Sequence, residues 1–251
     1  MLPGRRLIGC ARKVTCTATL QDAAAAARHR KPSPEHTLRY QNVELHNVCD
    51  TVEQDGHPGF TITRYPAAIL PEINPGARNN ATHGSGCEVR GMLPPGGEAR
   101  VTLQLLDTNV VPPVATVCHG DFSGQAVHLT REPTEITIKQ PDRLAMMQRI
   151  ARDQQMPSDP NLVRVCLPPI HPVRIISIEG DLTYPEPDAT PDRTLLSYGS
   201  SITHGAHAIS PRGTYAAQCA WRLGYDLINL GVGGSARMDA AIADHIAARD
   251  D

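Results

Sequence analysis

A serine flanked by small and polar residues is the first feature that could do chemistry. Ser201 stands in "LSYGSSITHGA" (196–206), after a short apolar run and Gly199 and before an Ile-Thr pair. A serine hydroxyl becomes nucleophilic when a base removes its proton and donors stabilise the oxyanion that attack creates. The carboxyl end of a parallel strand suits such a serine, because the next helix offers backbone N–H groups there. On its own the stretch is also typical of a Ser/Thr-rich loop that caps a helix.

A second, glycine-rich stretch follows about thirty residues later, "NLGVGGSA" at 229–236. It ends the next buried run of the chain, so both stretches are expected at the same carboxyl edge of one parallel sheet. Glycine lets a backbone N–H approach a ligand closely. The two stretches together therefore predict a nucleophile at Ser201 and an oxyanion donor on the neighbouring strand.

These two stretches resemble the first two sequence blocks of the SGNH/GDSL hydrolases, which are serine esterases and lipases with a flavodoxin-like three-layer α/β/α fold. The resemblance covers roughly residues 194–245. It implies that Ser201 is the nucleophile and that the N–H groups of Ser201 and Gly234 bind the oxyanion, with Gly233 as the second choice. Ser200 stands where the family usually has aspartate.

The family's remaining blocks, Gly-x-Asn-Asp for an oxyanion Asn and Asp-x-x-His for the catalytic pair, do not occur in this sequence. We therefore expect a C-terminally truncated hydrolase domain that is weakly active or inactive by itself. His204 and His207 lie near Ser201, but a histidine on the nucleophile's own turn is poorly placed to be its base. His204 is expected to line the mouth of the site or to face solvent.

The elements that must position these residues divide the chain into parts. Residues 37–183 form short β-branched or alternating runs between Gly, Pro, Asn and Asp clusters, which predicts a jelly-roll-like β-sandwich. This region resembles the sandwich domains that precede the catalytic domain in a bacterial branch of the family. Residues 184–193 predict a linker, and residues 194–251 predict strand, helix, strand and helix, the start of an α/β sheet. Residues 1–36 are expected to be a disordered or targeting-like tail. The fold class is thus α/β plus all-β.

The composition argues against several classes of function. The net charge of −2 on 251 residues gives no basic field for nucleic acid or an anionic membrane, and no apolar stretch approaches about 18 residues. The seven scattered cysteines show no C-x-x-C pairing, so we expect neither a disulfide framework nor a metal site. We expect a soluble, cytoplasmic protein that acts on a small-molecule or carbohydrate ester without a cofactor. The sequence leaves its oligomeric state open.

Two other functions stay open. "GVGGSA" (231–236) fits the dinucleotide pattern G-x-G-x-x-A, although it follows a later strand than such a loop requires. The β-rich region could instead be a non-catalytic carbohydrate- or protein-binding module with a vestigial hydrolase segment. Trp221, the sole tryptophan, is expected in the core rather than as a sugar platform. Asp239 and Asp244 are expected on the solvated face of the last helix, and Asp121 at a turn or domain interface.

Overall fold

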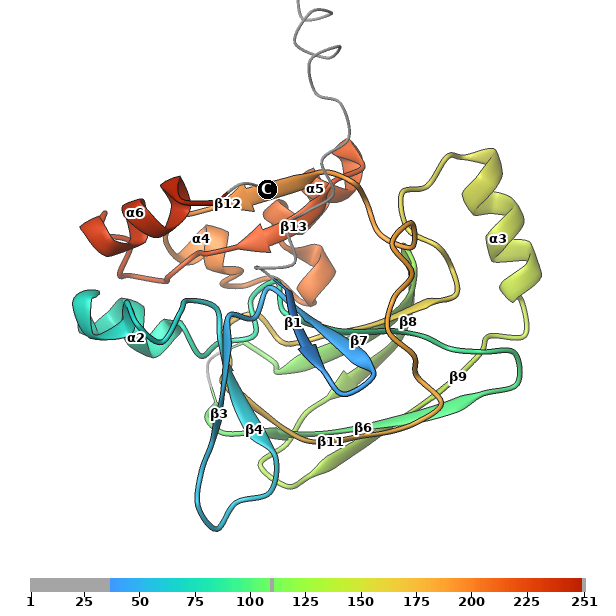
Figure 1. Ribbon diagram of the computed structural model, residues 1–251, viewed down its shortest axis with the longest axis horizontal. Coiled ribbons are helices and arrows are strands. Elements are labelled where there is room, and N and C mark those ends of the chain that lie inside the picture. The colour runs from blue at the N-terminus through green and yellow to red at the C-terminus, as the bar shows by residue number, and fades with distance from the viewer. Residues whose placement is uncertain (1–36, 109–110, 250–251) are drawn as a thin grey trace, which may run out of the picture. The chain divides into compact units, whose positions relative to one another are not determined.

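Two antiparallel sheets and a smaller parallel one make up the computed structural model, which describes residues 37–108 and 111–249 (Figure 1). The described residues all belong to one compact unit. The predicted tail, residues 1–36, lies outside the described residues. No helix in the described part of the chain is long and apolar enough to cross a membrane.

The larger sheet has six strands in the order β1-β2-β5-β10-β7-β8, and all its pairings are antiparallel. Its strands, in sheet order, are Thr37–Tyr40 (β1), Val43–His46 (β2), Glu88–Met92 (β5), Leu162–Cys166 (β10), Val114–His119 (β7) and Phe122–His128 (β8).

The second sheet has five strands in the order β3-β4-β11-β6-β9, again all antiparallel. Its strands, in sheet order, are Asp50–Glu53 (β3), Phe60–Thr63 (β4), Val173–Gly180 (β11), Glu98–Leu105 (β6) and Thr134–Lys139 (β9).

The two sheets share one hydrophobic core. Along β6 every second residue is buried, so that Val101 and Leu103 face inward while Arg100 faces solvent, as the two-residue period of a strand requires. These side chains join Leu45 and Val163 of the larger sheet in a single buried cluster. The chain is therefore a strand-rich, mixed α/β protein, as its sequence predicts at this coarse level.

The third sheet pairs β12 (Thr194–Ser197) with β13 (Asp226–Asn229) in parallel. The longest helix between them, α5 (Tyr215–Leu223), begins and ends at residues that the sequence marks. The Thr214 hydroxyl accepts the N–H of Ala217 at 3.2 Å, and Gly224 ends the helix with a φ of 68°. The predicted strand, helix and strand are all present in the expected order.

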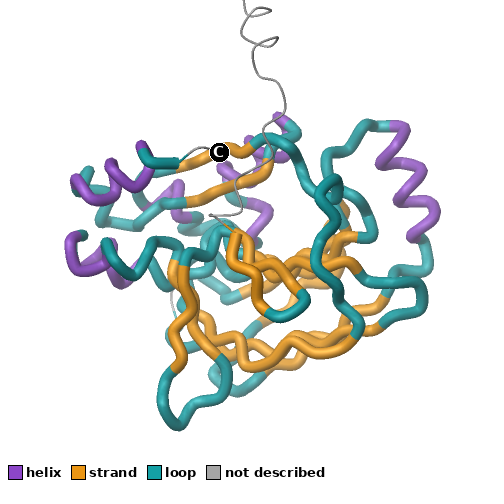
Figure 2. Tube along the Cα trace, in the orientation of Figure 1, coloured by secondary structure: helices purple, strands orange, loops and turns teal. Residues whose placement is uncertain are grey.

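The other helical segments of the described residues have ten residues or fewer. They are the 3₁₀ turns η2 (Leu70–Glu72) and η3 (Pro211–Gly213) and the helices α2 (Pro75–Asn80), α3 (Leu144–Asp153), α4 (Ser201–His204) and α6 (Ala240–Ala247). Figure 2 shows α2 among the turns that connect β4 to β5.

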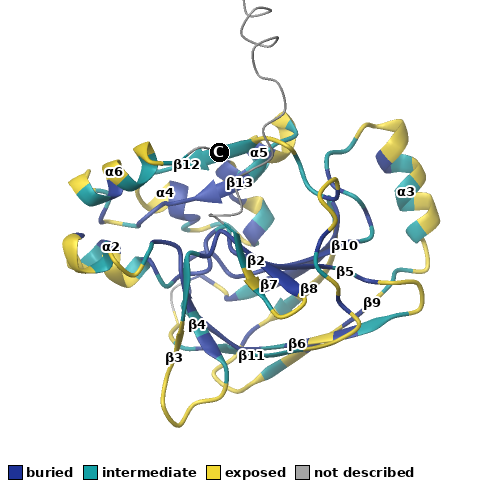
Figure 3. Ribbon diagram, viewed as in Figure 1, coloured by how far each residue is buried: buried dark blue, intermediate teal, exposed yellow. Residues whose placement is uncertain are grey.

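The α/β segment (residues 194–249) lies against the larger sheet of the strand-rich region (residues 37–183). Figure 3 shows β2, β5, β10 and β13 largely buried, and their residues are buried at almost every position. A ring nitrogen of His46 in β2 lies 2.7 Å from the carbonyl oxygen of Leu227 in β13. The strand-rich region and the α/β segment therefore meet through buried polar contacts as well as apolar ones.

Candidate active site

Ser201 lies just beyond the carboxyl end of β12. The strand ends at Ser197, three residues follow, and Ser201 begins α4. Gly199 makes this tight turn possible, because a Cβ at that position would lie 2.4 Å from the hydroxyl oxygen of Thr203. Ser201 is exposed, so a substrate can reach it.

The glycine loop, residues 230–235, lies at the same edge of the parallel pair. Ser197 and Asn229 are the last pair in the parallel register of β12 and β13. The N–H of Leu230 donates to the carbonyl oxygen of Ser197 at 2.8 Å. A Cβ added to Gly233 would lie 3.7 Å from the Cα of Ser201. The structure thus brings together the two stretches that the sequence singles out.

The two candidate oxyanion donors differ in what they contact. Gly234 is exposed, has a φ of 67°, and donates its N–H to the hydroxyl oxygen of Ser200 at 3.0 Å. Gly233 donates its N–H to Nδ1 of His204 at 3.1 Å. An exposed serine hydroxyl moves away by one side-chain rotation, whereas a buried ring does not. This difference favours Gly234 over Gly233, although its role as an oxyanion donor stays a prediction.

His204 is buried, so the expectation that it lines the mouth of the site or faces solvent is wrong. Its side chain is turned under the glycine loop, where Nδ1 accepts the N–H of Gly233. Burial is the main cause that lowers the pKa of His204 to about 2, and the nearby Arg64 guanidinium and His83 ring add to the effect. The ring is therefore neutral near pH 7, and because Nδ1 accepts, the proton sits on Nε2.

His83 supports His204 from the strand-rich region. The two rings are stacked, with centroids 5.0 Å apart and an interplanar angle of 10°. Burial and the Arg64 guanidinium lower the pKa of His83 to about 3. Two neutral stacked imidazoles form part of the floor beneath the glycine loop, and neither is available to activate Ser201.

Among the described residues, no base contacts the candidate nucleophile. Within residues 37–108 and 111–249, no side chain hydrogen-bonds to the Ser201 hydroxyl. His207, the second nearby histidine, is exposed. The described residues therefore provide an accessible serine and nearby amide donors.

The strand-rich region holds the glycine loop in place, a feature that the sequence did not reveal. Arg64 is fully buried and donates to the carbonyl oxygens of Asn229 and Gly231 at 2.8 and 2.9 Å. The Tyr65 hydroxyl donates to the carbonyl of Leu230 at 2.5 Å. These side chains come from the segment after β4, more than 160 positions before the loop in every case. Sequence motifs relate residues over a few tens of positions, so they could not have predicted these contacts.

The two aspartates of the last helical segment have different environments. Asp239 precedes α6 and accepts hydrogen bonds from the backbone N–H and the side-chain amide of Asn74, at 3.3 and 2.7 Å. The expectation that it lies on a solvated helix face is therefore wrong, because it links α6 to the strand-rich region. Asp244 is exposed, as expected.

A buried ion network lies at the opposite end of β13 from the glycine loop. Arg90 donates to both carboxylate oxygens of Asp226, at 2.6 and 2.7 Å. Burial alone would raise the pKa of Asp226, but the charge and hydrogen bonds of Arg90, together with the nearby His46 and Arg164, outweigh burial and lower it below its ordinary value. Asp121, predicted at a turn or domain interface, pairs with Arg212 of the α/β segment at 3.5 Å.

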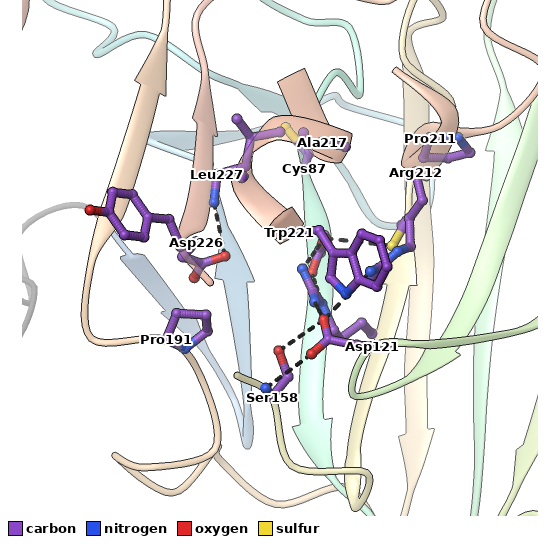
Figure 4. A pocket seen from close by; sticks show the side chains of 16 residues that line it. Cys87, Asp121, Ser158, Pro191, Pro211, Arg212, Ala217, Trp221, Asp226 and Leu227 are labelled. Carbon is purple, nitrogen blue, oxygen red and sulfur yellow. Dashed lines mark hydrogen bonds and ion pairs between the residues drawn. The ribbon is translucent and has the colours of Figure 1, made fainter. Parts of the chain in front are cut away.

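A small cavity borders this network, and Figure 4 shows Trp221, Arg212 and Asp121 among the side chains that line it. Its volume of about 40 Å³ is room for about one water molecule and too little for an ester substrate. Trp221 is 40% exposed, so its expected place in the core is wrong. The buried face of α5 is formed by Ala216 and Ala220 instead.

The glycine loop does not have the geometry of a dinucleotide-binding turn. Such a turn leads directly into the helix whose N-terminus holds the pyrophosphate. Here α6 begins only at Ala240, six positions after Gly234. A dinucleotide site also needs an acidic residue about 20 positions after the glycines, and the acidic residues nearest that spacing, Asp250 and Asp251, lie outside the described residues.

Comparison with known proteins agrees with the resemblance. Residues 192–251 match the GDSL-like lipase/acylhydrolase family, which confirms the predicted resemblance over that range. No curated protein sequence matches the chain.

Two solved structures are similar in fold. The salicylyl-acyltransferase SsfX3 from a tetracycline biosynthetic pathway has a TM-score of 0.56 at 19% identity, and the match covers 82% of this chain and 54% of that one. A protein from Bacteroides ovatus assigned as a GDSL-like lipase has a TM-score of 0.53 at 19% identity, and the match covers 75% and 55%. The chain thus spans about half the length of these structures.

Proposed function

We propose that this chain carries the nucleophile-bearing part of a GDSL-type serine esterase or acyltransferase. The Ser201 hydroxyl attacks an ester carbonyl, and the N–H groups of Ser201 and Gly234 bind the oxyanion that forms. Collapse of this intermediate expels the alcohol and leaves an acyl group on Ser201. Water, or a second alcohol in a transfer reaction, then takes the acyl group and restores the hydroxyl.

One observation carries this proposal. An exposed serine and a glycine loop meet at the carboxyl edge of a parallel strand pair, within the residues that match the family. The proposed layout extends this observation: the two antiparallel sheets form a jelly-roll-like sandwich at 37–183, residues 184–193 link it, and residues 194–251 begin a flavodoxin-like domain. The likeness to SsfX3 supports this layout at the level of the fold.

The alternative function is a binding module with a vestigial hydrolase segment. Such a module would be expected to fold with few specific bonds to that segment. Instead, Arg64 and Tyr65 of the strand-rich region donate to three consecutive carbonyls of the strand end and glycine loop, at residues 229–231. This integration of the two regions favours the catalytic proposal.

We propose a small-molecule or carbohydrate ester as the substrate class and the cytoplasm as the location. The activity of this chain by itself is proposed to be low, because no described side chain contacts Ser201 as a base. Even a slow reaction leaves a stable product when the acyl group stays on the serine.

The test measures acetyl transfer from p-nitrophenyl acetate. Wild type is compared with Ser201→Ala, and Ser123→Ala serves as control because Ser123 is an exposed serine on β8. We expect mass spectrometry to find the acetyl group on Ser201, and nitrophenolate release to fall at least about tenfold in Ser201→Ala alone. Equal rates in all three proteins, with no acetyl group on Ser201, would remove the nucleophile from the proposal.

A further inference from the structure

The peptide between Gly233 and Gly234 is held from the strand-rich region. The side-chain amide of Asn80 donates to the carbonyl oxygen of Gly233 at 2.7 Å. On the other side of the same peptide, the N–H of Gly234 donates to the Ser200 hydroxyl at 3.0 Å. Both polar groups of this one peptide thus have a partner, and the partners come from different regions of the chain.

The geometry of a peptide bond couples these two contacts. In a trans peptide the C=O and the N–H point in opposite directions, and no described peptide bond is cis. A donor that fixes the Gly233 carbonyl on one side therefore fixes the Gly234 N–H on the other. That other side is the edge at which Ser200 and Ser201 lie.

An external anchor matters here because the peptide joins two glycines. Glycine reaches positive and negative φ with similar ease, so rotation of this peptide meets little steric resistance. Rotated by half a turn, the peptide would present its carbonyl oxygen, rather than its N–H, to the edge beside Ser201. A carbonyl oxygen would repel an oxyanion that the N–H would bind.

Asn80 is itself firmly placed. It is the last residue of α2, and its own carbonyl oxygen accepts a hydrogen bond from the buried Arg64 at 2.6 Å. Arg64 also donates to Gly231 of the glycine loop, so the anchor and the loop are fixed to the same guanidinium group.

We infer that Asn80 is a positioning residue that orients the Gly233–Gly234 peptide so that the Gly234 N–H faces the substrate side of Ser201. The inference deepens the proposed function, on which its catalytic consequence rests. Asn80 contacts no reacting atom, and it acts only through the direction of one N–H group. The strand-rich region thereby contributes to the oxyanion site without lining it.

The test replaces Asn80 by aspartate, which keeps the shape but removes both donor hydrogens. Asn79→Asp is the matched control, since Asn79 is the neighbouring, exposed residue of α2. The direction of the Gly234 N–H is measured by residual dipolar coupling in ¹⁵N-labelled full-length protein. The kcat and KM of hydrolysis of p-nitrophenyl acetate are measured on the same samples, and Asn80→Ala replaces Asn80→Asp if the latter does not fold.

We expect the Gly234 coupling to change in Asn80→Asp and to match wild type in Asn79→Asp. We also expect kcat to fall at least about tenfold in Asn80→Asp with KM within about twofold, because one oxyanion donor supplies about 10²-fold or more. An unchanged Gly234 coupling, or an unchanged kcat for a Ser201-dependent reaction, overturns the inference. If Ser201→Ala reacts as fast as wild type, the proposed function fails instead, and the coupling alone then decides the role of Asn80.

Discussion

Acid should destabilise this protein through the buried histidine under the glycine loop. The pKa of His204 is about 2 in the folded chain against an ordinary value of 6.5. Between these values the unfolded chain binds a proton that the folded chain does not, so the free energy of unfolding falls as the pH drops below about 6.5. The loss is roughly 1.4 kcal/mol per pH unit, or about 2 kcal/mol for His204 at about pH 5.

The assay is urea denaturation followed by circular dichroism, at about pH 7.5 and about pH 5. His204→Asn keeps an acceptor near the position of Nδ1 for the Gly233 N–H but cannot titrate. We expect the stability lost between the two pH values to be about 2 kcal/mol smaller in His204→Asn than in wild type. His57→Asn, a change at an exposed histidine, should leave that loss unaltered. A loss in His204→Asn equal to that of wild type would refute the assignment of His204 as a buried neutral ring.

Two further predictions concern how the glycine loop is packed and held. Gly231→Ala places a Cβ 2.5 Å from the backbone nitrogen of His204, so we expect thermal denaturation to show that the free energy of unfolding falls by about 2 kcal/mol or more. Gly96→Ala is the control, because a Cβ there meets no atom and only the positive φ of 74° is unfavourable, which costs about 1 kcal/mol. A stability equal to that of Gly96→Ala would contradict this close approach. In Arg64→Lys we expect urea denaturation to show that the free energy of unfolding falls by at least about 3 kcal/mol. One ammonium group cannot reach all the backbone carbonyls to which the guanidinium group donates. Wild-type stability in Arg64→Lys would show that these bonds are dispensable.

The parts of the structure that the sequence predicts are those set by local chemistry. Thr214 and Gly224 mark the ends of α5 because capping depends on a few neighbouring residues. The shared edge of Ser201 and the glycine loop follows from two parallel strands that are consecutive in the chain and joined by a helical connection, which is also a relation between neighbouring segments. Features that depend only on residues near each other in the chain, such as helix ends, can be predicted before the fold is known.

The environments of His204 and Trp221 depend on longer-range packing. A histidine three positions after an exposed serine suggests a place near solvent, but His204 is turned inward onto His83 of the strand-rich region. Trp221 is the largest apolar side chain of α5, yet the residues of α5 that are buried are the small Ala216 and Ala220. The partner surface decides which face of a short helix is buried, and that surface is distant in sequence.

Arg64 shows most clearly why the candidate site requires both regions of the chain. A buried guanidinium normally pairs with a carboxylate, whereas the described partners of Arg64 are the carbonyl oxygens of Asn80, His83, Asn229 and Gly231. A loop rich in glycine can approach a substrate closely because it lacks side chains, and for the same reason it cannot fix the direction of its own peptides. The direction must therefore be imposed by donors from elsewhere, and Arg64 supplies several at once. The glycines give the loop peptides their conformational freedom. Donors of the strand-rich region restrict that freedom at the carbonyl oxygens, while His204 accepts the N–H of Gly233 from below.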